Sequence, residues 1–244
     1  MTPLLIAHRT APLHAPENTL AGIRAAVDAG AQVVEIDVRR GLGRTLFLHH
    51  DSHGWRLLRF PWVLRWTPWG LLKHLPQRGQ AGRLATFEQA LELLGELSNH
   101  VSYAVDTKQP SVAPLVVEAV RSAGLGSRIR PWSERPKAVR IYVAGLPHSE
   151  VALLRSGDTP ADSEGFLDRA AELGASAVSA HWLEITHEFV EAAHGRNLKV
   201  YPWNQDWLDD LEAKLGAGID GVVTDHLEVV GAAIVDNQSD LSGT

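Results

Sequence analysis

Short apolar runs alternate with longer amphipathic stretches along nearly the whole chain, and this alternation limits the folds that the sequence can adopt. Each apolar run has the length of a strand, and the stretch after it has the residue spacing of a helix. The first pair consists of a strand from Leu4 to His8 and a helix from Asn18 to Gly30. Repeated units of this kind predict a parallel sheet covered by helices.

Eight strands are predicted, at residues 4–8, 33–38, 101–107, 128–132, 150–155, 177–181, 199–203 and 221–224. Predicted helices follow at 18–30, 112–123, 138–144, 163–173, 187–194 and 207–215, with a last helix from about Leu227. Right-handed crossovers close eight such units into a (β/α)8 (TIM) barrel. An open doubly wound sheet is the alternative, but its nucleotide-binding form needs a glycine-rich turn after the first strand. Residues 8–18 contain no glycine, which favours the barrel.

The length of 244 residues suits one barrel. A strand at Thr45 to His50 after the turn Gly41 to Arg44 predicts a hairpin at the rim. Residues 52–85 are rich in Trp, Pro, Arg and Leu and predict a rim insertion, and the small polar residues 236–244 predict a frayed tail. We therefore expect one barrel domain over residues 1–235.

Charge and composition exclude several classes of partner and cofactor site. A formal net charge of −6 argues against nucleic-acid binding, which needs concentrated Lys and Arg. The chain has no cysteine, so a metal would be held by oxygen or imidazole. No segment approaches the roughly 20 apolar residues that span a bilayer, and the N-terminus lacks the pattern of a secretion signal. A cytoplasmic protein is expected.

Chemistry-bearing side chains lie at the predicted carboxyl ends of strands, where the loops of a barrel meet at one mouth. They are His8, Arg9, Glu35, Asp37, His50, Asp51, Asp106 and Lys108. Glu35 and Asp37 are two residues apart on a strand and therefore point to the same face. With Asp106 they form a candidate site for a hard divalent cation such as Mg²⁺ or Ca²⁺. Their residue types fit equally well with buried ion pairs to Arg39, Arg40 or Lys108.

Two histidines among these residues predict proton transfer at a phosphate ester. Because imidazole in general titrates near neutral pH, His8 and His50 can serve as general acid and base. Arg9 and Lys108 would then hold the phosphate. A single histidine at a strand end is more often structural, but two of them beside three acids, an arginine and a lysine favour a catalytic site.

Four segments resemble the signatures of the glycerophosphodiester phosphodiesterase family. They are His8-Arg9-Thr10 with Pro16-Glu17-Asn18-Thr19, Glu35-Ile36-Asp37-Val38 with His50-Asp51, Asp106-Thr107-Lys108, and the last two strands around residues 200–204 and 218–225. The likeness covers almost the whole chain and is weakest between residues 125 and 175. Thr10 and Asp106 stand where the family usually has Gly and Glu, and Gly41 and Gly43 replace its usual Thr and Asp.

The resemblance implies a (β/α)8 fold and metal-dependent hydrolysis of glycerophosphodiesters to an alcohol and glycerol 3-phosphate. It implies that His8 and His50 are the acid/base pair and that Arg9 and Lys108 contact the phosphate. It also implies a divalent ion, Mg²⁺ or Ca²⁺, on the three acids Glu35, Asp37 and Asp106. The nucleophile is either water or the glycerol hydroxyl of the substrate, through a cyclic phosphate.

Two other activities are compatible with the sequence. Tryptophans in the insertion, with nearby arginines, predict peripheral contact with lipid and hydrolysis of lysophospholipids, although the same aromatics could simply pack on the rim. These residues are Trp62, Trp66, Trp69, Arg59 and Arg65. A barrel that binds phosphate without catalysis is the alternative from another class. His181 and Trp203, at the ends of the sixth and seventh strands, are expected either to shape the head-group pocket or to pack at the rim.

Overall fold

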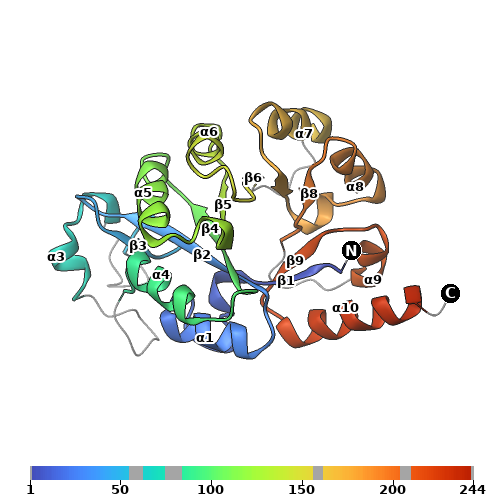
Figure 1. Cartoon of the computed structure of the whole chain (residues 1–244), viewed down its shortest axis with the longest axis horizontal. Helices are drawn as coiled ribbons and strands as arrows, with labels where there is room; N and C mark the ends of the chain where they lie inside the picture. Colours follow the sequence, from blue (N-terminus) through green and yellow to red (C-terminus); the bar gives the residue numbers. More distant parts are fainter. Residues whose placement is uncertain (1, 55–62, 75–83, 156–161, 204–209, 243–244) are drawn as a thin grey trace.

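The computed structural model describes residues 2–54, 63–74, 84–155, 162–203 and 210–242. Helices surround a sheet whose parallel strands follow one another around a ring (Figure 1). Its order is β8-β7-β6-β5-β4-β2-β1-β9. The strands are β1 Leu4–Ala7, β2 Val33–Arg40, β4 Ser102–Thr107, β5 Ile129–Ser133, β6 Ala152–Leu154, β7 Ala177–Ser179, β8 Lys199–Val200 and β9 Gly221–Thr224.

The ring closes beyond the short strand β8. Trp203 forms parallel bridges with His181 on one side and with Val223, in β9, on the other. The sheet therefore returns to its first strands, and the predicted (β/α)8 barrel is confirmed. Most predicted strands agree with the observed ones within one or two residues, but the three before the last strand are shorter than predicted.

The helices lie outside the barrel. They are α1 Leu20–Asp28, α4 Phe87–Glu96, α5 Ala113–Ala123, α6 Pro136–Gly145, α7 Ser163–Glu172, α8 His187–His194, α9 Leu211–Gly216 and α10 Leu227–Ser242. The start of the predicted helix 207–215 lies partly outside the described residues. Helix α4 was not among the predicted helices. A capping box begins it, in which the Thr86 side chain accepts from the Gln89 amide and Gln89 reciprocates.

The predicted hairpin is present. Strand β3, Leu46–Leu48, is antiparallel to β2, with Val38 opposite Leu48. The described part of the insertion contains a short 3-10 helix, Leu64–Trp66, and α3, Trp69–Leu72. Both pack on the hairpin through a small apolar cluster of Phe47, Leu64, Leu72 and Leu84. Residues 55–62 and 75–83, which include the predicted lipid-contact residues Arg59 and Trp62, lie outside the described residues.

The two faces of β2 have separate roles. Val34, Ile36 and Val38 join the core between sheet and helices, whereas Val33 belongs to a second apolar cluster inside the barrel. Because successive side chains of a strand alternate in direction, Glu35 and Asp37 share the inward face of Val33. The strand thus carries both carboxylates into the barrel, above an apolar layer.

A charged network closes the opposite, amino-terminal end of the barrel, and we call it the floor cluster. Both oxygens of the Glu150 carboxylate are engaged: Lys199 Nζ donates to Oε2 at 2.7 Å, Tyr201 Oη donates to Oε1 at 2.8 Å, and Arg130 also pairs with Oε1. Burial alone would raise the pKa of Glu150, but Arg130, Lys199 and Tyr201 lower it below its usual value. The ring of Tyr201 stacks on Trp132 inside the barrel.

The C-terminal segment differs from the expected frayed tail. Helix α10 continues to Ser242, because no glycine or proline interrupts it between residues 232 and 242. The Gln238 side-chain amide donates to the hydroxyl of Thr2, which ties this helix to the start of the chain.

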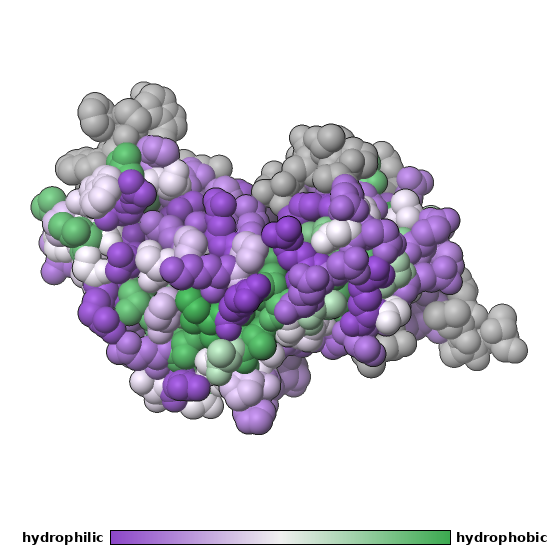
Figure 2. Space-filling model, turned by 90° about the horizontal axis from the view of Figure 1, so that it is seen from above, coloured by the Kyte–Doolittle hydropathy of each residue, from purple (hydrophilic) through white to green (hydrophobic). Residues whose placement is uncertain are grey.

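Polar and charged residues cover most of the face in Figure 2, and apolar residues gather in a central hollow and toward the end that carries α3. Exposed apolar side chains near that end include Leu42, Trp66 and Leu71. Among the described helices, none has the length and apolar character needed to cross a bilayer.

Candidate active site

One pocket at the carboxyl ends of the strands collects nearly all the predicted site residues. Among the described residues, those that line it are His8, Arg9, Glu35, Asp37, His50, Asp106, Lys108, Trp132, Glu134, Leu154, Arg155, Ser179, Trp203 and Val223. Eight of the nine predicted site residues are in this set, and His181 is not. Separate strands thus bring the residues together as the barrel topology requires.

Three buried carboxylates form the centre of this pocket. Asp37 lies opposite Asp106 in the register of β2 and β4, and Glu35 lies two residues earlier on the same face. Glu35, Asp37 and Asp106 are 4%, 1% and 5% exposed, and one oxygen from each lies within 4.8 Å of the others. Burial, together with the neighbouring acids, raises the pKa of Glu35 and of Asp106. Negative charge is therefore in excess here, which favours a bound cation.

Lys108 balances only part of this charge. Its Nζ lies 2.9 Å from Asp37 Oδ1 and also contacts Asp106, so the ion-pair interpretation holds for this lysine. Burial would raise the pKa of Asp37, but Lys108, His50, Arg9 and a hydrogen bond from Asn18 lower it. Arg39 instead donates from Nε to the carbonyl oxygen of His50 at 2.8 Å. The three acids supply the oxygen donors that suit a hard divalent cation.

A strained turn positions Arg9 after β1. Arg9, Thr10 and Ala11 all have positive φ values, of 44°, 65° and 60°. Left-handed backbone costs roughly 1 kcal/mol or more at each non-glycine residue, so surrounding contacts must hold the turn. The Arg9 amide donates to Glu35 Oε2 at 2.6 Å, and Thr10 packs against the backbone at Gly22 of α1. The turn fixes one oxygen of a candidate metal ligand.

Each histidine of the pocket is paired with an aspartate. Nδ1 of His8 lies 2.8 Å from Asp225 Oδ1, and Nδ1 of His50 lies 2.9 Å from Asp51 Oδ1. Because an ionised carboxylate only accepts hydrogen bonds, it selects the tautomer with a proton on Nδ1. Nε2 of each ring then remains for proton exchange with a bound molecule. This arrangement suits two acid/base groups.

The neighbouring His49 has a different environment. It is buried and is not among the described residues that line the pocket. Burial lowers the pKa of His49 to about 4, with smaller opposing effects of nearby acids, so it stays neutral at pH 7. Burial also lowers the pKa of His50, but that ring reaches the pocket. His49 and His50 are adjacent in the sequence, but only His50 lines the pocket and can act on a bound molecule.

The second half of the barrel provides the far wall. Trp203 lines the pocket, and its Nε1 donates to the carbonyl oxygen of Arg155 at 3.3 Å. His181 packs edge-on against Trp203, with 4.8 Å between ring centroids, and its Nδ1 accepts from the Leu183 amide. The structure thus places His181 behind Trp203. The head-group role of both residues stays a prediction.

Several residues of the site were not predicted from the sequence. Asp51 was visible in the His-Asp motif, but Asp225 follows the last strand, and only the closed barrel brings it to His8. Arg155 lines the pocket and is paired with the buried Glu184. Glu134 also lines the pocket, directly after β5. Position at the end of a strand is the one sequence signal that these residues share.

Comparison with known proteins connects this geometry to a family. The sequence model of the glycerophosphoryl diester phosphodiesterase family matches residues 8–229. The chain belongs to this family. The match begins at His8 and contains every predicted site residue. A glycerophosphodiester phosphodiesterase of Caldanaerobacter subterraneus subsp. tengcongensis is 24% identical over 242 residues, covering 94% of this chain and 97% of that protein.

Solved structures with similar names share the fold. A glycerophosphodiester phosphodiesterase from Parabacteroides distasonis superposes with a TM-score of 0.82 at 20% identity, covering 97% of this chain and 98% of that one. An Oleispira antarctica phosphodiesterase in complex with the product sn-glycerol-3-phosphate gives a TM-score of 0.80 at 21% identity, with coverage of 96% and 97%. The family fold therefore extends over the whole barrel.

Proposed function

We propose that the protein hydrolyses glycerophosphodiesters to glycerol 3-phosphate and an alcohol. One observation carries the proposal: two histidine–aspartate pairs, an arginine and a lysine surround three buried carboxylates in a single pocket. These groups provide what phosphodiester cleavage needs, which is proton transfer at two oxygens and positive charge at the phosphate. Family membership and the glycerol 3-phosphate bound to the Oleispira antarctica protein support the same reaction.

The histidines exchange the protons in this mechanism. One of His8 and His50 accepts a proton from the attacking hydroxyl, and the other donates a proton to the leaving alkoxide. Asp225 and Asp51 hold the two rings and stabilise whichever imidazole becomes charged. Water and the glycerol hydroxyl of the substrate are both suitable nucleophiles. Detection of a cyclic phosphate by ³¹P NMR would assign the hydroxyl, and its absence during turnover would assign water.

Positive charge at the phosphate comes from Arg9 and Lys108. Arg9 Nε is buried without a hydrogen bond to any described residue and lies 3.8 Å from Asp37 Oδ2. Glu35, Asp37 and Asp106 would hold Mg²⁺ or Ca²⁺. Such an ion supplies Lewis-acid stabilisation of the charge that develops on the phosphoryl oxygens. The planar guanidinium of Arg9 and the ammonium of Lys108 orient the diester and limit its rotation.

Metal removal and restoration test this function. The protein is stripped with a chelator and incubated with glycerophosphocholine, and glycerol 3-phosphate is followed after separate addition of Mg²⁺, Ca²⁺ or Mn²⁺. We expect turnover only after metal is restored. Release of product in the presence of excess chelator would contradict metal dependence. Phosphate binding without product under every condition would establish the non-catalytic barrel instead.

A second candidate function is the hydrolysis of lysophospholipids. It is favoured by Trp66, which is 62% exposed at the rim with Arg65 stacked 4.5 Å above its ring. Trp69, in contrast, stacks on Phe47 and fits the packing alternative. Comparison of kcat/KM for glycerophosphocholine and lysophosphatidylcholine separates the two substrates. A strict preference for the soluble diester would remove the lipid function and, with it, the predicted membrane contact.

A further inference from the structure

A second open pocket adjoins the active-site pocket, and its wall is strongly basic. Its volume is about 730 Å³, which is in the usual range for small-molecule sites. The described residues that line it are Arg40, Arg65, Trp66, Lys108, Gln109, Pro110, Ser111, Pro114, Arg135, Lys137 and Ile141. Five of them are cationic and none is acidic. We call it the basic pocket.

Four of its five cations have no compensating carboxylate in the described part of the chain. Arg40, Arg65, Arg135 and Lys137 make no ion pair with any described carboxylate. The guanidinium of Arg40 donates to a backbone carbonyl, that of Gly43, and Arg65 stacks on Trp66. The nearby acid Glu134 lines the active-site pocket instead. The basic pocket therefore keeps a net positive charge in a chain whose net charge is −6.

Two helices add to this potential at their amino-terminal ends. Ser111 and Pro114 lie at the beginning of α5, and Arg135 and Lys137 lie at the beginning of α6. The positive end of a helix dipole favours anions near its first turn. These contributions reinforce the side-chain charges and do not replace them.

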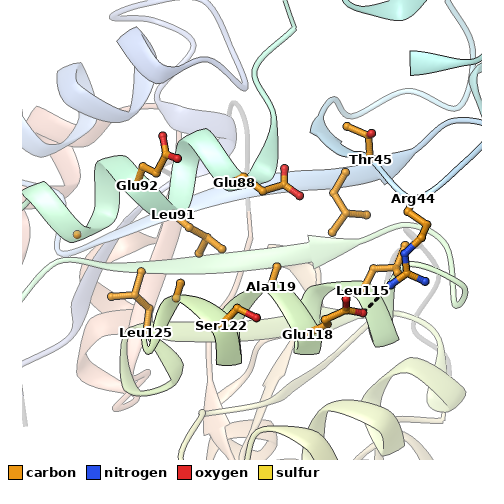
Figure 3. Close-up of a pocket in the computed structure, with 13 residues that line it drawn as sticks. Arg44, Thr45, Glu88, Leu91, Glu92, Leu115, Glu118, Ala119, Ser122 and Leu125 are labelled. Carbon is orange, nitrogen blue, oxygen red and sulfur yellow. Dashed lines mark hydrogen bonds and ion pairs between the residues drawn. The ribbon is translucent and has the colours of Figure 1, made fainter. Parts of the chain in front are cut away.

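Another open pocket shows that such a basic wall is not general on this surface. Figure 3 shows a groove between α4 and α5, in which Leu91, Leu115 and Leu125 face the hollow. The volume of this groove is about 700 Å³. Its charged residues are mostly acidic, namely Glu88, Glu92 and Glu118, and its one arginine, Arg44, pairs with Glu118 at 2.6 Å. Charge in the basic pocket is thus of opposite sign and, apart from that of Lys108, is not paired with a carboxylate among the described residues.

The position of Lys108 links the basic pocket to the reaction. Its side chain lines both pockets and contacts two of the central carboxylates. A diester whose phosphate lies beside Lys108 therefore has one arm within reach of the basic pocket. The glycerol 3-phosphate arm has no second charge, so a further anionic group must belong to the alcohol arm.

We propose that the basic pocket binds a second anionic group, such as a phosphate ester, on the alcohol arm of the substrate. The preferred substrates are then glycerophosphodiesters with an anionic alcohol. This inference rests on the proposed phosphodiesterase function and defines its substrate class. Charge complementarity of this kind acts on substrate capture, so the effect falls on kcat/KM and weakens as salt screens the charges.

Two soluble substrates that differ by one phosphate test the inference: glycerophosphoinositol and glycerophosphoinositol 4-phosphate. For the unmodified protein we expect kcat/KM to be about tenfold higher for the phosphorylated diester at low salt, since each tenfold corresponds to about 1.4 kcal/mol. R135Q and K137Q should remove most of this advantage and leave the rate on glycerophosphoinositol unchanged. The matched control is R140Q, which removes an exposed arginine of α6 outside the pocket and should keep the advantage.

A binding measurement separates this inference from the proposed reaction. Calorimetric titration with inositol 4-phosphate, the alcohol that would be released, needs no turnover. We expect binding that is weakened in R135Q and K137Q and retained in R140Q. Absence of hydrolysis of both diesters would overturn the proposed function, whereas equal kcat/KM for the two diesters would overturn only the anionic-alcohol inference.

An anionic membrane surface is the other source of anionic groups for the basic pocket. Cosedimentation measures binding to this source. It uses vesicles of phosphatidylglycerol, with vesicles of phosphatidylcholine as a neutral control. If R135Q and K137Q lose vesicle binding but keep the advantage for the phosphorylated diester, or if the unmodified protein has no such advantage, the pocket is not a substrate site. If R135Q and K137Q lose the advantage for the phosphorylated diester but keep their vesicle binding, the result supports the inference.

Discussion

The barrel holds charged clusters at both ends, and they differ in how their charges are balanced. In the floor cluster, Glu150 is contacted by Arg130, Lys199 and Tyr201, and its pKa is lowered. At the mouth, three carboxylates share mainly Lys108 and Arg9, and the pKa of Glu35 is raised. A buried charge with its partners present supports folding, whereas an excess of buried like charge costs folding energy until a ligand arrives.

The largest expected effect is on catalysis at the mouth. His8→Ala and His50→Ala should each lower kcat by about 10²–10⁴ while circular dichroism stays unchanged, because each removes an acid/base group. Glu150→Gln, at the floor, should change kcat by no more than about threefold, because it does not reach the substrate. Near-normal turnover in both histidine variants would remove the acid/base assignment.

The next effect is on stability at the floor. Glu150→Gln leaves two cations facing a neutral amide, and we expect the free energy of unfolding to fall by about 1–3 kcal/mol in urea titrations, since these groups are partly exposed. The control is Glu118→Gln, which breaks the exposed pair with Arg44 and should cost about 0.5 kcal/mol or less. Equal losses in the two variants would contradict the special role of the floor cluster.

The smallest expected effect is a gain of stability at the mouth, opposite in sign to the loss expected for Glu150→Gln. In the presence of a chelator, Glu35→Gln should raise the free energy of unfolding by about 1 kcal/mol, because it removes one of three like charges. The amide oxygen of Gln can still accept from the Arg9 amide. The same variant should lose the stabilisation that added Mg²⁺ or Ca²⁺ gives to the unmodified protein. If Glu35→Gln instead lost as much stability as Glu150→Gln, the buried charges at the two ends of the barrel would be balanced alike.

The pH dependence of stability follows from the same contrast. The pKa of Glu35 is higher in the folded protein than its ordinary value of 4.5, so the unfolded chain releases this proton first as pH rises. The contribution of Glu35 to stability is therefore lost as pH increases above about 4.5 in metal-free protein. Glu150 has a lowered pKa, so its contribution is present above its ordinary range and is lost on acidification. Urea titrations at several pH values, with and without Glu35→Gln, separate the two contributions.

Much of the fold could be predicted because the alternation of apolar runs and amphipathic stretches repeats along the chain. Buried parallel strands such as Leu4–Ala7 are continuous apolar runs, and glycines end several helices, so the eight strands were identifiable. Helix α4 was missed because it follows the irregular insertion, although Thr86 and Gln89 mark its start. Residues 236–242 continue α10, because polar composition does not prevent a helix in a segment without glycine or proline.

The candidate site was predictable as far as its residues lie in short motifs. Glu35 and Asp37 belong to one strand, so their common face follows from the period of the strand. The pair of His8 with Asp225 spans 217 positions and depends on the closure of β1 against β9. The basic pocket gathers cations from the hairpin, the insertion, the loop after β4 and the start of α6, and no local pattern predicts that these cations lie together.

The turn after β1 gives the outer helix α1 influence over the reaction centre. A Cβ atom at Gly22 would lie 2.8 Å from the Pro16 carbonyl oxygen and 2.9 Å from that of Thr10, both of which are backbone atoms. An engineer who replaces helix glycines by alanine to gain thermal stability would thus push this turn away from its support. The Arg9 amide would then lose its fixed direction toward Glu35, and activity would fall through a residue that never meets the substrate.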